Sequence, residues 1–260
     1  MKFYLTFLVC FLITIATSQN SLQNTPNPNA LETNTDFKSL SFPSIDGLKI
    51  SARLYQAQSD AQPILLCHQA RFNKQEYADI APRLREMGYT SLAIDQRSGG
   101  DFASEANQTY NRAQAKGLST DYVDAQQDIE AALDYLYQKT KQPVILWGSS
   151  YSSALVFFVA KKYPEKVKAV ISFSPDNYFG DQRENLNTVF NELKQAFWVT
   201  SSKEESKRLS QLIDKNQLDN NQTQFIPKQE GHHGSRALWV NQIHNEEYWE
   251  SLKAFLDHIK

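Results

Sequence analysis

From residue 37 onward, short apolar runs alternate with segments in which apolar residues recur at helical spacing. Within residues 120–137, for example, Ile129, Leu133 and Leu136 have the spacing of one helix face. This alternation is typical of strands and crossover helices, and it predicts an α/β domain with a mostly parallel central sheet and helices on both faces. We expect strands near residues 37–42, 49–55, 63–67, 90–94, 144–147, 167–173, 196–200 and 224–226, about seven or eight in all, and helices over residues 75–87, 120–137, 183–193, 203–216 and 246–259, with another through Phe157 and Phe158.

The connections between these elements are mostly short. An Asp46-Gly47 turn joins the first two predicted strands, so we expect an antiparallel pair at one edge of the sheet. Residues 98–119 are polar with little periodicity, and a connection of this length predicts a functional loop. No insertion large enough for a lid domain follows the 167–173 strand. We therefore expect an open site, covered at most by the 98–119 loop.

The N-terminal segment has the pattern of a secretory signal. Lys2 precedes an apolar run over residues 3–16, which is shorter than the about 20 helical residues that span a bilayer. Small residues at Ala16 and Ser18 predict cleavage after Ser18, and hence a secreted or periplasmic protein without a transmembrane segment. Residues 19–35 are rich in Asn, Thr, Gln and Pro. The predicted organisation is a signal peptide at 1–18, a disordered leader at 19–35 and one folded α/β domain at 36–260.

The net charge and the number of cysteines bear on nucleic-acid binding and on disulfide formation. The formal charge of −2 is mild, and no basic stripe with interleaved aromatic residues appears, so the sequence does not favour nucleic-acid binding. Signal cleavage would remove Cys10 and leave Cys67, which cannot form an internal disulfide alone. Because Cys67 lies in an apolar strand, we interpret it as a small buried hydrophobic residue.

The pentapeptide Gly148-Ser149-Ser150-Tyr151-Ser152 lies between the predicted strand at 144–147 and an apolar helix. A serine on a tight strand-to-helix turn, with small residues two positions before and after it, exposes a nucleophilic oxygen at the edge of a parallel sheet. Bulky residues at the flanking positions would clash with the adjoining strand and helix. The same segment also fits a simple helix cap, in which Ser149 or Ser150 satisfies free N–H groups.

A serine nucleophile requires a base, an acid that orients the base, and N–H donors for the oxyanion. Two segments offer candidates in the chain order serine, acid, histidine. They are residues 201–205 (SSKEE), after the 196–200 strand, and residues 231–234 (GHHG), before the closing helix. The glutamates equally fit charges that complement a helix dipole, and the paired histidines equally fit a solvated loop. No partner cysteine or His-x-x-x-His spacing accompanies them, so we expect no metal site.

Three motifs together resemble the α/β-hydrolase superfamily, in particular small dienelactone hydrolase-like and acyl esterase members. Residues 65–70 (LLCHQA) resemble the family's strand and oxyanion loop, and residues 92–100 (LAIDQRSGG) resemble its strand ending in Asp-x-Arg-Gly-x-Gly. The serine pentapeptide is the third motif. The resemblance covers residues 37–260, and it implies an α/β-hydrolase fold without a large lid domain and an activity that needs no cofactor.

The resemblance implies roles for the residues that match these motifs. Ser150 corresponds to the nucleophile, and the backbone N–H groups of Tyr151 and Ala70 correspond to the oxyanion donors. The sequence departs from the family at two positions. Gln69 replaces a glycine in the oxyanion loop, which leaves the path of that loop open, and Ser152 replaces the last glycine of the serine motif.

The acid and the histidine are implied in the same way. The family places a carboxylate just after a strand, and Glu205 fits that pattern if Ser202 takes the place of a glycine, with Glu204 as the alternative. A glutamate is adequate because the acid has only to stay ionised and orient the imidazole. His233 fits the family's histidine better than His232 because a glycine follows it.

Two residues are candidates for substrate binding. Arg71 follows the oxyanion loop directly, where its guanidinium can form bidentate hydrogen bonds to an anionic group, although a solvated loop arginine fits the pattern as well. Tyr178 belongs to an aromatic stretch after a predicted strand, and we expect it and the side chain of Tyr151 to face the substrate. We interpret Asp95 and Arg97 as a structural pair that braces their own turn.

The sequence thus predicts a serine hydrolase that cleaves a small-molecule carboxylic ester through a Ser-His-Glu triad and an acyl-enzyme. Two alternatives remain open at this point. The same triad also suits an amidase or peptidase, and a hydrolase-like binding protein without turnover has the same motifs. The acyl and alcohol groups of the substrate and the oligomeric state are not predicted.

Overall fold

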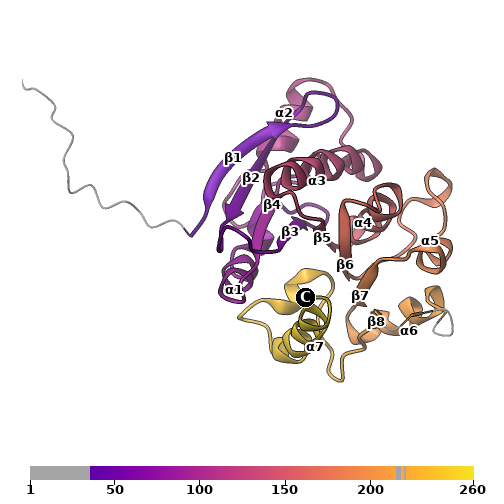
Figure 1. The fold of residues 1–260 in the computed structure, drawn as a ribbon. Coiled ribbons are helices and arrows are strands. Elements are labelled where there is room, and N and C mark those ends of the chain that lie inside the picture. The colour runs from indigo at the N-terminus through magenta and orange to yellow at the C-terminus, as the bar shows by residue number, and fades with distance from the viewer. Residues whose placement is uncertain (1–35, 215–217, 220) are drawn as a thin grey trace, which may run out of the picture. The chain divides into compact units, whose positions relative to one another are not determined.

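The computed structural model describes residues 36–214, 218–219 and 221–260 (Figure 1). The predicted signal peptide (1–18) and leader (19–35) lie outside the described residues. Within the described residues, one eight-stranded sheet has the order β1-β2-β4-β3-β5-β6-β7-β8, which confirms the expected α/β sheet. Its strands are β1 (Lys38–Pro43), β2 (Lys49–Tyr55), β3 (Pro63–Cys67), β4 (Thr90–Ile94), β5 (Val144–Ser149), β6 (Val167–Phe173), β7 (Ala196–Thr200) and β8 (Gln222–Gln224).

The strands at one edge of the sheet differ in direction from the others. β2 is antiparallel to both β1 and β4, whereas β4, β3, β5, β6, β7 and β8 run parallel. The expected antiparallel pair at the edge is therefore confirmed, and its turn contains Gly47 at a φ of 78°. In a parallel sheet all carboxyl ends meet at one edge, which is where sites form in open α/β folds.

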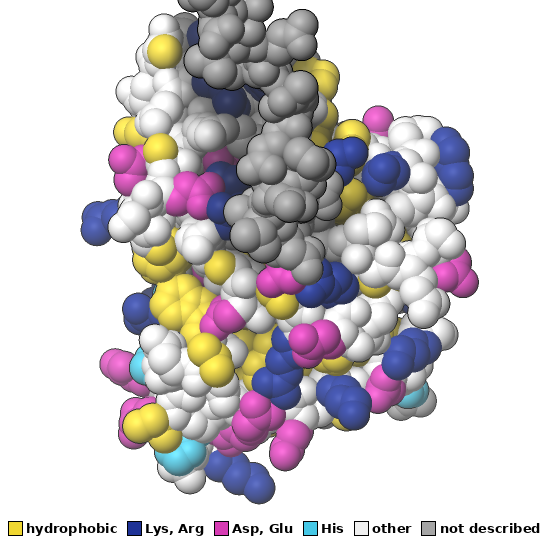
Figure 2. Space-filling view, turned by 90° about the vertical axis from the view of Figure 1, so that its left-hand side faces the viewer, with side chains coloured by type: hydrophobic (Ala, Val, Ile, Leu, Met, Phe, Trp, Pro, Cys, Tyr) yellow, Lys and Arg dark blue, Asp and Glu magenta, His cyan; other side chains and the backbone are white. Residues whose placement is uncertain are grey.

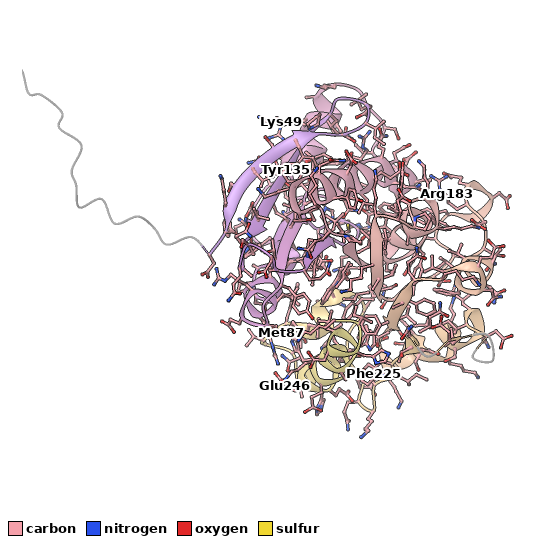
Figure 3. All side chains as sticks on the ribbon, viewed as in Figure 1. Lys49, Met87, Tyr135, Arg183, Phe225 and Glu246 are labelled. Carbon is pink, nitrogen blue, oxygen red and sulfur yellow. The ribbon has the colours of Figure 1, made fainter. Side chains whose placement is uncertain are left out.

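Helices cover both faces of the sheet, as expected (Figure 1). α3, α4, α5 and α6 pack on one face, and α1 and α7 pack on the other. Successive side chains of β3 point to opposite faces of the sheet, so Leu65 packs in the core of the first face and Leu66 in the core of the second. Tyr135 of α3 stacks on Phe42 of β1 at 4.7 Å between ring centroids (Figure 3). The helices are α1 (Ile80–Glu86), α2 (Gln108–Ala115), α3 (Gln126–Thr140), α4 (Tyr151–Lys162), α5 (Leu186–Glu192), α6 (Lys203–Leu212) and α7 (Asn245–His258), with the 3-10 helices η1 (Lys74–Tyr77), η2 (Tyr122–Ala125), η3 (Gly180–Gln182) and η4 (Ser235–Leu238).

Several predicted segments differ from the observed structure. The prediction of a loop at 98–119 was wrong, because α2 forms within it. The Asn107 side chain caps this helix by accepting the N–H of Tyr110 at 2.8 Å, and Thr109 accepts the N–H of Ser51 in β2 at 3.0 Å. Polar contacts therefore hold α2 to the sheet, which explains why it lacks an apolar period. The helices predicted at 75–87 and 120–137 are each divided, the first into η1 and α1 and the second into η2 and α3.

The expected pair of Asp95 and Arg97 does not form. Asp95 instead contacts Lys74 at 3.1 Å, whereas Arg97 contacts Asp128 of α3 and Asp46 of the first turn at 2.7 Å each. The long Arg97 side chain reaches away from its own turn and joins α3 to the β1–β2 turn. Arg97 and Asp128 are both buried, so this ion pair is part of the interior.

On the face drawn in Figure 2, basic and acidic side chains are interspersed, with small groups of hydrophobic side chains between them. Among the described residues, no helix is long and apolar enough to cross a membrane.

Candidate active site

Ser150 lies on the sharp turn between β5 and α4. Its φ is 57° and its ψ is −125°, a backbone conformation that is costly for a residue with a side chain. Its N–H donates to Phe173 O at 2.8 Å, which fixes the turn to β6. A Cβ added to Gly148 would lie 2.4 Å from Ser152 O, so this flanking position requires glycine. The Ser150 side chain does not cap α4, which removes the simple capping interpretation for this serine.

Three side chains that are distant in the sequence form one hydrogen-bonded chain. His233 Nε2 lies 2.7 Å from Ser150 Oγ, and His233 Nδ1 contacts Glu205 Oε1 on the other side of the ring. Ser150 belongs to the β5–α4 turn, Glu205 to the first turn of α6, and His233 to the loop before η4. The imidazole therefore lies between a hydroxyl and a carboxylate, the arrangement that activates a serine.

Glu205 is held by several donors besides His233. Its Oε2 accepts hydrogen bonds from Ser174 Oγ at 2.8 Å and from the hydroxyl and N–H of Ser202 at 3.0 and 3.2 Å. Burial acts to raise the pKa of Glu205, but the hydrogen bonds and the charge of His233 outweigh it and lower the pKa to about 2. The alternative acid, Glu204, is exposed, and its carboxylate does not contact His233.

Both predicted oxyanion donors have free N–H groups. Tyr151 is the first residue of α4, where an N–H has no intrahelical acceptor, and Ala70 lies in a turn closed by a 3.3 Å bond from Phe72 N to Gln69 O. Neither N–H has an acceptor among the residues that the structure describes. Gln69, which replaces the family's glycine, is buried, and its own N–H donates to Glu76 Oε2 at 2.7 Å.

Of the residues expected to face the substrate, Tyr178 is 38% exposed and contacts Ser174, which itself donates to Glu205. The Tyr178 hydroxyl donates to Ser174 O at 2.7 Å, and desolvation of this hydroxyl raises its pKa to about 12. Arg71 is exposed at a φ of 64° and has no ion-pair partner among the described residues. The expectation for the Tyr151 side chain was wrong, because it is buried and its hydroxyl accepts from Gln96 Nε2 at 2.8 Å.

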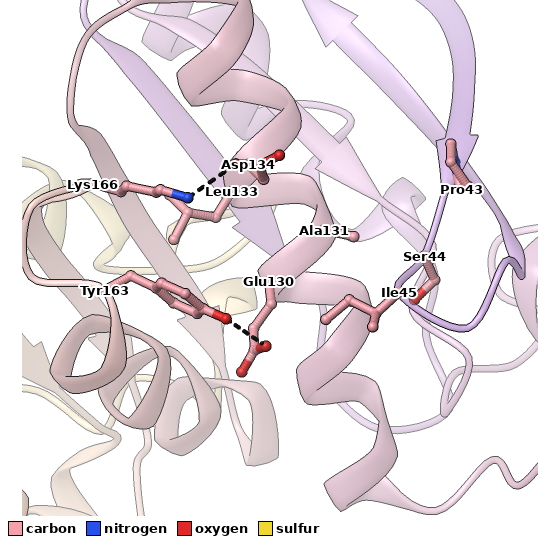
Figure 4. A pocket seen from close by; sticks show the side chains of 9 residues that line it. All are labelled: Pro43, Ser44, Ile45, Glu130, Ala131, Leu133, Asp134, Tyr163 and Lys166. Atoms are coloured by element: carbon pink, nitrogen blue, oxygen red, sulfur yellow. Dashed lines mark hydrogen bonds and ion pairs between the residues drawn. The ribbon is translucent and has the colours of Figure 1, made fainter.

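The hydrogen-bonded chain borders two hollows. One of about 480 Å³ is lined by residues that include Glu205, His233 and Arg236, and one of about 90 Å³ is lined by residues that include Tyr178. A separate hollow of about 320 Å³ lies between the β1–β2 turn, α3 and the end of α4 (Figure 4). It is lined by Glu130, Asp134 and other residues, none of which was predicted to belong to the site.

Two further residues at the site were not found from the sequence. Glu76 is fully buried in η1, and its Oε1 accepts a hydrogen bond from Ser149 Oγ at 2.6 Å. Ser174, directly after β6, donates to the Glu205 carboxylate. Neither residue lies in a sequence motif. Their roles become visible only in the structure, where each contacts a residue that is distant in the sequence. Among the described residues, no group of three or more His, Cys, Asp or Glu side chains is placed to hold a metal ion.

Comparisons with known proteins agree with this fold. An esterase from Pyrococcus furiosus is 16% identical with a TM-score of 0.64, over 86% of this chain and 93% of that one. A dienelactone hydrolase from Anabaena variabilis is 14% identical with a TM-score of 0.62, over 86% of this chain and 98% of that one. Est1E from Butyrivibrio proteoclasticus is 15% identical with a TM-score of 0.61, over 85% and 98% of the two chains. A search of the curated proteins found no match.

A comparison with protein families finds a match across the α/β domain. The matching model is Hydrolase_4, described as serine aminopeptidase, S33, and it covers residues 58–255. This match includes the β5–α4 turn, α6 and the loop that carries His233. Because it extends over more than half of the sequence, the chain belongs to this family of α/β-hydrolases.

Proposed function

We propose that the protein is a serine hydrolase that cleaves a small-molecule carboxylic ester through an acyl-enzyme. The observation that supports this proposal is the hydrogen-bonded chain from Ser150 through His233 to Glu205. Ser150 is the nucleophile, His233 the general base and Glu205 the acid that orients the base. With its low pKa, Glu205 stays ionised at neutral pH, as this role requires.

The reaction has two halves. In the first, His233 Nε2 takes the hydroxyl proton of Ser150 as Oγ attacks the acyl carbon, and the carbonyl oxygen gains the negative charge. The N–H groups of Tyr151 and Ala70 donate to this oxygen. The intermediate then expels the alcohol, which leaves with the proton from His233. In the second half, His233 deprotonates a water that attacks the acyl carbon, and the acid is released as Ser150 regains its proton.

Arg71 and Tyr178 are proposed to contact the substrate. The Arg71 guanidinium directly follows the oxyanion loop and is free to bind an anionic group, and Tyr178 lies beside Ser150. Two of the similar structures are named as an esterase and a dienelactone hydrolase, which agrees with ester cleavage. The family description, serine aminopeptidase, favours amide cleavage as the second candidate function.

A fluorophosphonate probe tests the assignment of the nucleophile. The probe should label folded wild-type protein at Ser150, located by peptide mapping, and it should not label Ser150→Ala. Ser39→Ala, a change at an exposed position of β1, is the matched control and should be labelled normally. Absence of labelling on folded wild-type protein would contradict the proposal and favour a binding protein without turnover.

Matched acyl esters and amides then separate the two candidate reactions. Hydrolysis of short-chain esters at rates well above those of the corresponding amides is expected for an esterase. An amide or N-terminal aminoacyl substrate cleaved with the higher kcat/KM would instead make the protein a peptidase.

We also propose export of the protein as a secreted or periplasmic enzyme, on the basis of the apolar run that ends in the small residues Ala16 and Ser18. N-terminal sequencing of protein from the native host should begin at Gln19. A sequence that begins at Met1 would contradict export by this signal.

A further inference from the structure

Glu76 is a fully buried carboxylate next to the proposed catalytic residues. Among the described residues, no cation lies within ion-pair distance of it. Instead, each carboxylate oxygen accepts one hydrogen bond. Oε1 accepts from Ser149 Oγ at 2.6 Å, and Oε2 accepts from the N–H of Gln69 at 2.7 Å. A buried acid held only by neutral donors needs a reason, because burial without a countercharge is costly.

These hydrogen bonds connect the segments that carry the proposed machinery. Gln69 directly precedes Ala70, and Ser149 directly precedes Ser150. Ser149 Oγ in turn accepts the N–H of Ser235 at 2.8 Å, and Ser235 lies two residues after His233. The carboxylate of Glu76 therefore connects the oxyanion loop, through Gln69, to the turn that carries Ser150, through Ser149. The Ser149 hydroxyl extends this connection to the loop that carries His233.

The donor pattern matches the ionised carboxylate. The Gln69 N–H can only donate, and the Ser149 hydroxyl donates its hydrogen to Glu76 while its oxygen accepts from the N–H of Ser235, so both carboxylate oxygens act as acceptors. Protonation would turn one oxygen of Glu76 into a hydroxyl, which is a poorer acceptor, and would weaken the hydrogen bond that this oxygen receives. The surroundings leave little room to adjust, since a Cβ on Gly234 would lie 2.6 Å from Ser149 Oγ.

We propose that the ionised carboxylate of Glu76 is a positioning group that keeps the oxyanion loop, Ser150 and His233 in their working geometry, so that activity requires its ionisation. This inference rests on the proposed function and adds a residue that acts through the hydrogen bonds of others.

The charge of Glu76 is sensitive to pH in the range where such an enzyme works. Burial raises the pKa of its carboxyl to about 7, although the hydrogen bonds from Ser149 and Gln69 and the charges of His233 and Arg236 oppose the rise. The titratable or charged groups that face it are His233 and Arg236 across the site and Tyr77 on η1.

Glu76→Gln is the first test, because it keeps the size of the side chain but offers one acceptor where two donors arrive. We expect kcat for a phenyl ester to fall about tenfold or more at pH 8 with little change in KM, as one hydrogen bond to a charged acceptor is lost. The acid limb of the pH profile should also lose one titrating group. Glu86→Gln, at an exposed position at the end of α1, is the matched control and should behave as wild type.

Ser149→Ala supplies a signature that a purely structural residue would not produce. Glu76 remains titratable in this variant but loses the hydrogen bond that lowers its pKa. The acid limb of kcat should therefore move to higher pH, whereas in the double variant with Glu76→Gln it should not move. Thermal unfolding of each variant shows whether it is folded. If Glu76→Gln does not fold, the direction in which the acid limb of kcat moves in Ser149→Ala is by itself the test of this inference.

The outcomes separate this inference from the proposed function. Wild-type kcat and an unchanged pH profile in Glu76→Gln, or an unmoved acid limb in Ser149→Ala, would overturn the role of Glu76 while Ser150→Ala remains inactive. Hydrolysis by Ser150→Ala at the wild-type rate would instead overturn the proposed function itself.

Discussion

Replacing Glu205 with glutamine is the most direct perturbation of the proposed mechanism. The carboxylate uses one oxygen for His233 Nδ1 and the other for three donors, from Ser174 and Ser202. A glutamine has one carbonyl oxygen and one NH₂ group. If its oxygen replaces Oε2, three hydrogen bonds are kept and the NH₂ group faces His233. In the opposite orientation the NH₂ group faces the Ser202 N–H, which can only donate, and the hydroxyls of Ser174 and Ser202 have to reverse and accept, so we expect the first.

This orientation forces His233 into the wrong tautomer. Nδ1 has to accept from the NH₂ group, so Nε2 carries the proton and can no longer accept one from Ser150. The corresponding change in a serine triad lowers kcat on the order of 10⁴, or about 5 kcal/mol of transition-state stabilisation. Stability should fall moderately, because the folded protein lowers the pKa of Glu205 and this charge is lost, although glutamine is as suitable as glutamate at the third position of the Ser202 capping box.

The assay is kcat for a phenyl ester at pH 8, with thermal unfolding measured on the same preparations. Glu204→Gln is the matched variant, since it makes the same change at the adjacent exposed position, and its kcat should stay within about twofold of wild type. The reasoning is refuted if Glu205→Gln retains more than a tenth of wild-type kcat, or if Glu204→Gln suffers the larger loss.

Two further predictions concern stability. Because burial raises the pKa of Glu76 in the folded state, its ionisation favours unfolding, and wild-type stability should fall as pH rises from about 4.5 to about 7. Glu76→Gln lacks this term, so its melting temperature relative to wild type should increase from pH 5 to pH 8; a constant difference would contradict the prediction. Asp128→Asn removes a buried partner of Arg97 and should reduce the free energy of unfolding by about 3 kcal/mol in urea titrations, and a loss below about 1 kcal/mol would show that Asp46 suffices.

The sheet could be predicted from the sequence because its central strands are apolar at almost every position. β3, β4 and β7 begin and end at the predicted residues, since each is a short apolar run. α2 could not be predicted in this way. Its interior contacts come from Thr109 and Ala113, and its start is set by the Asn107 cap, so hydrophobic spacing carries little information about it.

Some residues of the site could be predicted from the sequence and others could not. The sequence indicated candidate segments through the small residues around Ser150 and the chain order serine, acid, histidine, and it favoured Glu205 and His233 through its resemblance to α/β-hydrolases. It gave no signal for Glu76, which lies in a charged segment where a glutamate normally faces solvent. Its burial arises only when Ser149 and Gln69, brought in by β5 and the loop after β3, close around it.

The two carboxylates near His233 differ in pKa because their environments differ. Glu205 is partly exposed and receives hydrogen bonds from His233, Ser174 and Ser202, so it remains charged well below neutral pH. Glu76 is fully buried with two neutral donors and changes charge near pH 7. Opposite pKa shifts in neighbouring acids commonly mark different roles. A loss of activity between pH 8 and pH 6 therefore cannot come from Glu205. If Glu76→Gln leaves that loss unchanged, the carboxylate of Glu76 has no part in it.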